Sequence, residues 1–152
     1  LRPSDVSNAP ALIDRFGVVA VNSAIEVDLY GHVNSTHIGG SRLVSGVGGS
    51  VDFNRNAHLT VVATHATAGG GDISTVVPRV THVDHTEHDV DAVVTEHGVA
   101  DLRGLSPTER ADCLVDCAAP AFRSRLRGYL DEAREGGGHL PYDPEAALDW
   151  RR

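Results

Sequence analysis

The chain has 152 residues and a formal net charge of −8 at pH 7, and 41% of its residues are hydrophobic and 22% charged. This is the composition of one globular domain with a real core, and not of a disordered segment. No apolar run approaches the roughly 20 residues that a membrane-spanning helix needs, so we expect no membrane contact. Because the chain is acidic and has no basic stripe, its charge argues against nucleic acid as a partner.

The choice of charged residues is unusual. All 13 basic residues are arginine, and aspartate outnumbers glutamate by 14 to 7. An acidic surface without lysine is typical of halophilic proteins from a saline cytoplasm, because net negative charge keeps them soluble. Codon bias in a GC-rich genome produces the same composition, and the sequence leaves both explanations open. The start lacks a signal-peptide pattern, and two cysteines make no disulfide framework, so we expect a cytoplasmic protein.

The first thirty residues predict one short helix and two strands. Residues 9–16 read as a helix with Asn8 as its N-cap. The short apolar run at 18–21 predicts a buried strand. Apolar and polar residues alternate over 25–30, which predicts a half-exposed strand joined to the first by a tight hairpin.

The middle of the chain is rich in glycine. Five glycines fall within residues 39–49, a backbone suited to close approach or to positive φ. Residues 51–56 predict a helical turn. Short apolar runs at 59–63, 74–77 and 90–94 predict three further strands.

The last third changes to helical periodicity. Ser106 and Glu109 form a capping-box pattern that predicts one helix, and Pro120 opens a second. Cys113 and Cys117 share a face of the first helix, where small apolar filling is favoured over a metal or redox site. The sequence contains no internal repeat. Five strands followed by a helical pair predict an α/β fold, and the short valine-rich runs are typical of a sheet covered on both faces.

Two segments could carry chemistry by their composition. The glycine turn at 45–50 exposes backbone N–H groups, which suit an oxyanion or a phosphate, although such a turn alone is more often structural. The run at 82–91 holds three histidines and four carboxylates. Its spacing matches no zinc pattern, and an acidic, hydrated surface strand is the favoured interpretation over a metal site. If it is a strand, one face carries His82, Asp84, Thr86 and His88.

Two single residues are weighed in the same way. Asn8 is fully explained by the predicted helix cap. Glu96 lies at a predicted strand end and is favoured as a surface or salt-bridged carboxylate.

Four ordered segments resemble one known family. They are NSAIEVDLYGHVN (22–34), SGVGGSVDF (45–53) with RNA (55–57), STVVP (74–78) before the histidine-rich run, and VVTEHGVADLRGLS (93–106) with ERA (109–111). In this order they resemble the C-terminal domain of the acetyl-CoA hydrolase/CoA-transferase family, in its succinyl-CoA:acetate CoA-transferase and acetyl-CoA hydrolase branch. The resemblance covers residues 1–139 as a partial domain and leaves 140–152 as a C-terminal tail, irregular or weakly helical.

The resemblance implies an α/β, CoA-transferase-like (NagB/RpiA/CoA-transferase-like) sheet with flanking helices, truncated at its N-terminal side. It also implies a mechanism in which a glutamate attacks an acyl-CoA thioester, and a glutamyl-CoA thioester forms by way of an anhydride. A carboxylate acceptor then takes CoA in transferases, and water does so in hydrolases. The sequence leaves these two reactions open.

The resemblance assigns roles to five residues. Asn8 and Gly49 match the oxyanion-stabilising positions, through a side-chain amide and a backbone N–H. The CoA-binding positions are Ser45, Gly46, Gly48 and Gly49. None of the seven glutamates matches the nucleophile, which is expected upstream of Asn8, so this chain alone is predicted to be inactive.

The resemblance also implies what the chain binds. Acyl-CoA and small carboxylates are the expected substrates, with coenzyme A as a substrate and no permanently bound cofactor or metal. The expected protein partners are a missing N-terminal portion or a partner subunit, in a homo-oligomer. The alternative is a non-catalytic CoA-binding or interaction module.

Overall fold

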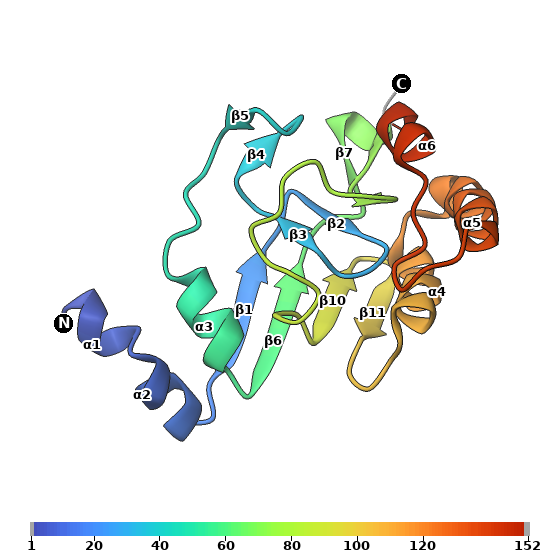
Figure 1. The fold of residues 1–152 in the computed structure, drawn as a ribbon. Helices are drawn as coiled ribbons and strands as arrows, with labels where there is room; N and C mark the ends of the chain where they lie inside the picture. Colours follow the sequence, from blue (N-terminus) through green and yellow to red (C-terminus); the bar gives the residue numbers. More distant parts are fainter. Residues whose placement is uncertain (1, 151–152) are drawn as a thin grey trace.

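The computed structural model describes residues 2–150, so residues 1, 151 and 152 of the predicted domain and tail lie outside the described residues. A four-stranded sheet forms its centre, in the order β1-β6-β10-β11 (Figure 1). The strands β1, β6 and β10 run parallel, and β11 is antiparallel to β10. Their bounds are Val19–Ser23 for β1, Leu59–Ala63 for β6, Ala92–Thr95 for β10 and Gly98–Asp101 for β11. The mixed α/β class predicted from the sequence is confirmed.

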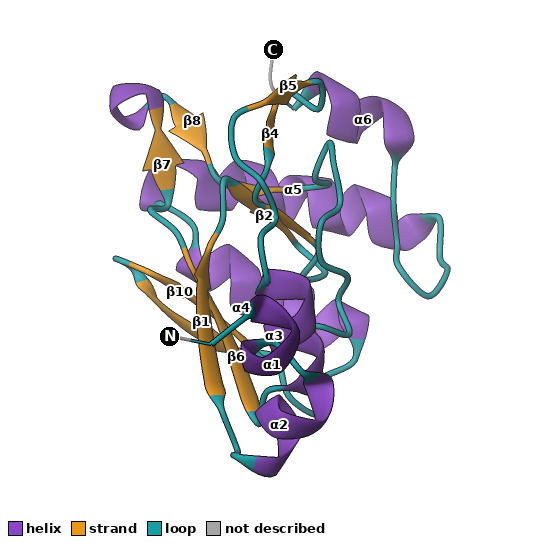
Figure 2. Ribbon diagram, turned by 90° about the vertical axis from the view of Figure 1, so that its left-hand side faces the viewer, coloured by secondary structure: helices purple, strands orange, loops and turns teal. Residues whose placement is uncertain are grey.

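One face of this main sheet is covered by helices. The short helix α3 (Ser50–Asn56) packs on β1 and β6, and α4 (Pro107–Cys117) packs on β10 and β11. Both helices lie on the same face of the sheet. The strand register places Asn22 of β1 and Thr95 of β10 on this face. Asn22 donates to the side chain of Asn54 in α3, and Thr95 donates to the carbonyl of Cys117 in α4. Figure 2 shows α1 (Ser4–Ser7) and α2 (Pro10–Arg15) grouped with α3.

The opposite face of the main sheet is apolar and exposed. Val19 and Val21 of β1 have exposed fractions of 56% and 66%, and Val99 of β11 has 67%. The register places Val61 and Val94 on this same face. No helix among residues 2–150 covers it, so the prediction that β1 is buried and that the sheet is covered on both faces is wrong for the described residues. We call these five valines the open face.

A second, smaller sheet lies above the first and is fully buried. Its order is β3-β2-β9, with β3 at Val33–Asn34, β2 at Glu26–Asp28 and β9 at Val76–Val77. The predicted half-exposed strand is therefore wrong, because both faces of β2 are covered. The predicted hairpin is wrong too, because β1 and β2 belong to different sheets.

Two small hairpins project from this second sheet. One pairs β4 (His37–Ile38) with β5 (Arg42–Leu43). The other pairs β7 (Thr67–Ala68) with β8 (Ile73–Ser74) across the 3₁₀ turn η1 (Gly69–Gly71). Each strand of these hairpins is only two residues long, so the sequence carried no periodic signal for them.

The C-terminal helices follow the prediction closely. Both halves of the Ser106–Glu109 capping box are present at the start of α4, and α5 (Pro120–Glu135) begins at the predicted proline. The tail forms a further helix, α6 (Pro144–Asp149), and the buried Trp150 stacks on Arg125 of α5 with 4.2 Å from the guanidinium carbon to the ring centre. None of the helices within residues 2–150 is long and apolar enough to cross a bilayer.

Candidate active site

The structure brings two of the predicted site residues into contact. Asn8 lies between α1 and α2, and Gly49 lies directly before α3. A methyl group added to Gly49 would overlap the amide nitrogen of Asn8, so the two residues touch. Forty residues separate them along the chain, and the packing of α2 against α3 joins them.

Both residues present unused donors at this contact. The Asn8 Oδ1 atom accepts a hydrogen bond of 3.0 Å from the Ser7 hydroxyl, which leaves the Nδ2 group directed at Gly49. Within residues 2–150, neither Asn8 Nδ2 nor the Gly49 N–H has an acceptor. Two unpaired N–H donors at one contact can stabilise an oxyanion as it forms, because each can donate a hydrogen bond to it.

The predicted helix-cap role of Asn8 is wrong. Ala9 is the N-cap residue of α2, and it makes no side-chain cap. Asn8 instead ends α1, where its backbone N–H donates to the carbonyl of Ser4 at 2.8 Å. The side chain of Asn8 therefore makes no hydrogen bond that caps α2.

The predicted CoA-binding residues lie within one stretch of chain that ends at this contact. Ser45, Gly46 and Gly48 lie on an exposed stretch between β5 and α3, and Gly49 closes it. Gly48 has a φ of +57°, which explains the need for glycine there. Three of the five residues at 45–49 are glycines and the others are Ser45 and Val47, so side chains leave much of the backbone of this stretch uncovered.

The histidine-rich segment 82–91, which we call the clamp, is a loop and not a surface strand. It makes a single bridge to β3, and its carboxylates bind to other groups of the protein. The Asp84 carboxylate accepts from the Ser35 N–H at 2.7 Å and from the Thr36 hydroxyl at 2.8 Å. Residues 2–150 contain no group of three or more His, Cys, Asp or Glu side chains arranged for a metal ion.

A second buried contact anchors the same segment. His32 lies between two carboxylates, with Nδ1 at 3.0 Å from Asp28 and Nε2 at 2.8 Å from Glu87. Arg79 Nη1 lies 3.6 Å from the other oxygen of Asp28, which is fully buried. The buried Asp28 carboxylate is thus paired with Arg79 and bonded to His32, contacts that link β2 to the segment 82–91.

Acid is expected to loosen this clamp. Burial alone raises the pKa of Asp84, but the hydrogen bonds from Ser35 and Thr36 outweigh it and lower the pKa. Burial also raises the pKa of Glu87, but its own backbone N–H and then His32 lower it. A carboxyl group with a lowered folded-state pKa stabilises the fold above its ordinary value and loses that contribution as the pH falls.

We therefore expect the free energy of unfolding, measured in urea, to fall as the pH drops below the ordinary values of 4.5 and 3.8. The variant Asp84→Asn cannot ionise, so it should be less stable at pH 7 and should show a shallower loss in acid. A parent protein equally stable at pH 7 and pH 3 would contradict this.

Glu26 and Glu96 also have structural partners. Glu26 is buried and accepts from Asn34 Nδ2 and the Thr81 N–H, each at 3.0 Å. Glu96 is exposed in the turn between β10 and β11, where the hydrogen bond from the Ala66 N–H lowers its pKa.

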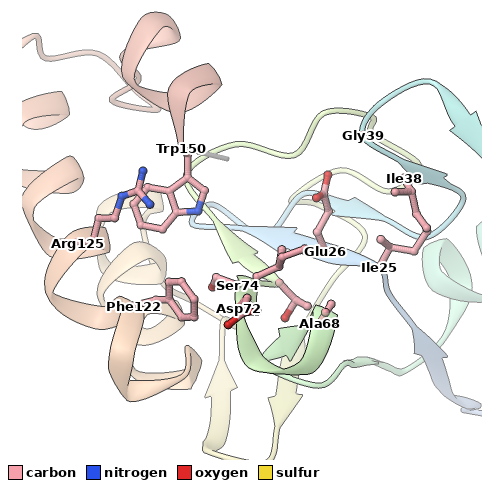
Figure 3. Close-up of a pocket in the computed structure, with 13 residues that line it drawn as sticks. Ile25, Glu26, Ile38, Gly39, Ala68, Asp72, Ser74, Phe122, Arg125 and Trp150 are labelled. Carbon is pink, nitrogen blue, oxygen red and sulfur yellow. The ribbon is translucent and has the colours of Figure 1, made fainter. Parts of the chain in front are cut away.

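A separate pocket of about 510 Å³ is lined by residues of β2, β4, the β7–β8 hairpin and α5, together with Trp150. Figure 3 shows Trp150 and Arg125 on one wall and Ile25, Ile38 and Glu26 on the other. Its lining includes none of the five predicted site residues.

The matching family model is the acetyl-CoA hydrolase/transferase C-terminal domain, over residues 1–130. The chain is 53% identical to the succinyl-CoA:acetate CoA-transferase of Clostridium kluyveri, over 99% of this chain and 28% of that protein. It is 46% identical to the acetyl-CoA hydrolase of Neurospora crassa, over 93% of this chain and 29% of that protein. The chain thus spans about three tenths of the length of these curated relatives.

Solved structures agree with the sequence comparisons. RipA from Yersinia pestis superposes with a TM-score of 0.75 and 33% identity, over 90% of this chain and 30% of that chain. The 4-hydroxybutyrate CoA-transferase of Porphyromonas gingivalis gives a TM-score of 0.67 and 33% identity, over 86% and 31%.

The fold is therefore that of CoA-transferases. The chain belongs to the acetyl-CoA hydrolase/transferase family and carries its C-terminal domain.

Proposed function

We propose that this chain supplies the oxyanion-stabilising donors of an acyl-CoA:carboxylate CoA-transferase or acetyl-CoA hydrolase that works through a glutamyl-CoA thioester. The contact of Asn8 with Gly49 carries this proposal, because it holds two unpaired N–H donors at one point. The relatives named above, a CoA-transferase and a hydrolase, support the reaction class.

The proposed reaction proceeds by acyl transfer to a glutamate. The glutamate carboxylate attacks the thioester carbonyl, the C–S bond breaks, and CoA leaves as a thiolate from an acyl–glutamyl anhydride. The thiolate then attacks the glutamyl carbonyl, which releases the acyl group as a carboxylate and leaves a glutamyl-CoA thioester. In a transferase, an acceptor carboxylate then attacks the glutamyl-CoA carbonyl and expels CoA thiolate, which attacks the acceptor's carbonyl in the new anhydride to give the new acyl-CoA and the free glutamate. In a hydrolase, water attacks the glutamyl-CoA carbonyl instead, and free CoA and the glutamate are released. Each attack places negative charge on a carbonyl oxygen, which Asn8 Nδ2 and the Gly49 N–H would stabilise.

The exposed glycine stretch would lie against the bound CoA. Ser45, Gly46 and Gly48 leave the backbone open to a long, flexible ligand such as the pantetheine arm, and Gly49 brings it to the donors. In this proposal CoA is a substrate, and the enzyme needs no metal and no permanently bound cofactor.

The nucleophilic glutamate would come from polypeptide outside these 152 residues. Glu26 and Glu96 are bound to structural partners, which supports this assignment. The open face supports it as well, because parallel sheets are normally covered on both faces. About seven tenths of the length of the Clostridium kluyveri relative lies outside the match, so a helical layer from that remainder is the occupant that we assign to the open face.

The proposal extends to the cellular setting. We infer a cytoplasmic enzyme that acts on small acyl-CoA esters and carboxylates as a homo-oligomer, with residues 1–139 as the partial domain and 140–152 as its tail. The acidic, lysine-free composition is consistent with a saline cytoplasm.

A chimera tests the proposal. The 152 residues replace the matching part of the Clostridium kluyveri enzyme, to which they are 53% identical. The chain alone is expected to release no CoA from acetyl-CoA or succinyl-CoA and to bind an apolar dye at its open face. The chimera should turn over acyl-CoA with a carboxylate acceptor or water and bind little dye.

Two results would contradict the proposal. Turnover by the isolated chain would show that the glutamate is not missing. A folded chimera that binds CoA without turnover would favour the alternative, a non-catalytic CoA-binding or interaction module.

A further inference from the structure

A histidine outside the proposed site reaches the glycine turn. The backbone of His85 is fixed to β3, since its carbonyl accepts from the Val33 N–H at 2.9 Å and its N–H donates to the Val33 carbonyl at 3.2 Å. Its side chain is 2% exposed. The Nε2 atom lies 3.1 Å from the hydroxyl oxygen of Ser50, the residue that follows Gly49. The pairing with β3 therefore holds an imidazole against the residue that ends the glycine turn.

The protons at this contact can be assigned. The Ser50 hydroxyl has one proton, and it donates to the Val47 carbonyl at 2.7 Å. The Ser50 oxygen must then accept from His85, so the Nε2 atom carries the proton. Burial lowers the pKa of His85, against the opposing influence of Asp89 and Asp84 and with the help of Arg55, so the ring is neutral at pH 7. Its Nδ1 atom is therefore unprotonated.

The turn depends on this support. Residues 45–48 are exposed, and Gly46 and Gly48 restrict the backbone little. Ser50 ties the turn back to Val47 and, through His85, to the core. This tie lies one residue from Gly49, which contacts the Asn8 amide.

We propose that His85 is a positioning residue: its Nε2–H, bonded to Ser50, sets the backbone of the Val47–Ser50 turn so that the Gly49 N–H lies beside the Asn8 amide. The positioning stands on the contacts alone, and its catalytic consequence rests on the proposed function. His85 touches no reacting atom.

The first test uses the 152-residue chain and needs no activity. Long-range ¹H–¹⁵N NMR spectra should show the neutral Nε2–H tautomer of His85 at pH 7. Ser50→Ala removes the tie from the turn side without opening the core, and it should lower the ¹H–¹⁵N heteronuclear NOE of the Gly48 and Gly49 amides, because the turn then moves more on the ps–ns timescale. An Nδ1–H tautomer, or an unchanged NOE at Gly48 and Gly49 in Ser50→Ala, would overturn the positioning role.

The second test separates positioning from the proposed chemistry. In the chimera, Ser50→Ala and His85→Leu should each lower kcat by roughly tenfold with little change in KM, and His85→Gln, which keeps an N–H near Ser50, should recover part of it. The double variant Ser50→Ala/His85→Leu should be no worse than the more damaging single variant. If the NOE of the Gly48 and Gly49 amides falls but kcat does not change, Gly49 is not an oxyanion donor and the proposed function fails while the positioning stands. Additive losses would overturn the Ser50–His85 coupling.

Discussion

Replacing Asn8 with alanine in the chimera is expected to lower kcat by about 10²- to 10³-fold, the loss measured when one oxyanion donor is removed from other acyl-transfer enzymes. The substrate carbonyl gains charge only as the transition state forms. The Asn8 Nδ2 group, which has no acceptor within residues 2–150, would therefore act on kcat and leave KM nearly unchanged. Steady-state rates with acetyl-CoA and an acceptor carboxylate measure both constants.

A matched asparagine provides the control. Asn56 also carries a side-chain amide, and it lies in α3, the helix that follows Gly49. Its Nδ2 group, however, donates to the Asp52 carbonyl at 2.7 Å within α3. Asn56→Ala should lower the stability of α3 and leave kcat close to that of the parent. An Asn8→Ala variant that folds and turns over within threefold of the parent would remove Asn8 from the mechanism.

A Gly49→Ala substitution is expected to be as damaging as Asn8→Ala. The backbone at Gly49 has φ −86° and ψ 3°, a turn conformation with negative φ that is open to alanine. The new Cβ would overlap the Asn8 amide nitrogen, so the side chain of Asn8 must move away from the Gly49 N–H. One methyl group would thus separate the two donors while leaving the turn intact, and kcat should again fall about 10²-fold or more.

A glycine outside the candidate site provides the control for this variant. Gly128 lies in α5, its φ is not positive, and a Cβ there meets no atom within 4 Å. Gly128→Ala should therefore keep kcat close to that of the parent. The double variant Asn8→Ala/Gly49→Ala should lose little beyond either single variant, because both disable one contact. Fully additive losses would mean that the two residues act separately.

The helices could be predicted because their signals are local. The Ser106–Glu109 capping box and the buried residues Ala111 and Leu114, three apart on one face, fix α4 within a dozen residues. The strand β2 could not be predicted in the same way. Its Glu26 and Asp28 alternate with apolar residues as on a half-exposed strand, yet both are buried because Thr81 and Arg79 reach them from about fifty residues away.

The candidate site could likewise be predicted only in part, because its residues were named by the resemblance and its contacts depend on the fold. The resemblance named Asn8 and Gly49, and the structure adds that they touch, a contact formed only when α2 packs on α3. Composition alone suggested a metal or a hydrated strand at 82–91. The pairing of His85 with Ser50, 35 residues apart, was missed because neither residue stands in a pattern that points to the other.

The site of covalent attachment in the chimera tests the central claim most directly. Acetyl-CoA is added without an acceptor carboxylate, the protein is digested, and mass spectrometry locates the glutamate that carries CoA as a thioester. We expect that glutamate to lie in the Clostridium kluyveri portion, with the yield of adduct lowered by Asn8→Ala. CoA bound to any glutamate within the 152 residues, or turnover in which no enzyme-bound CoA forms under these conditions, would contradict the account.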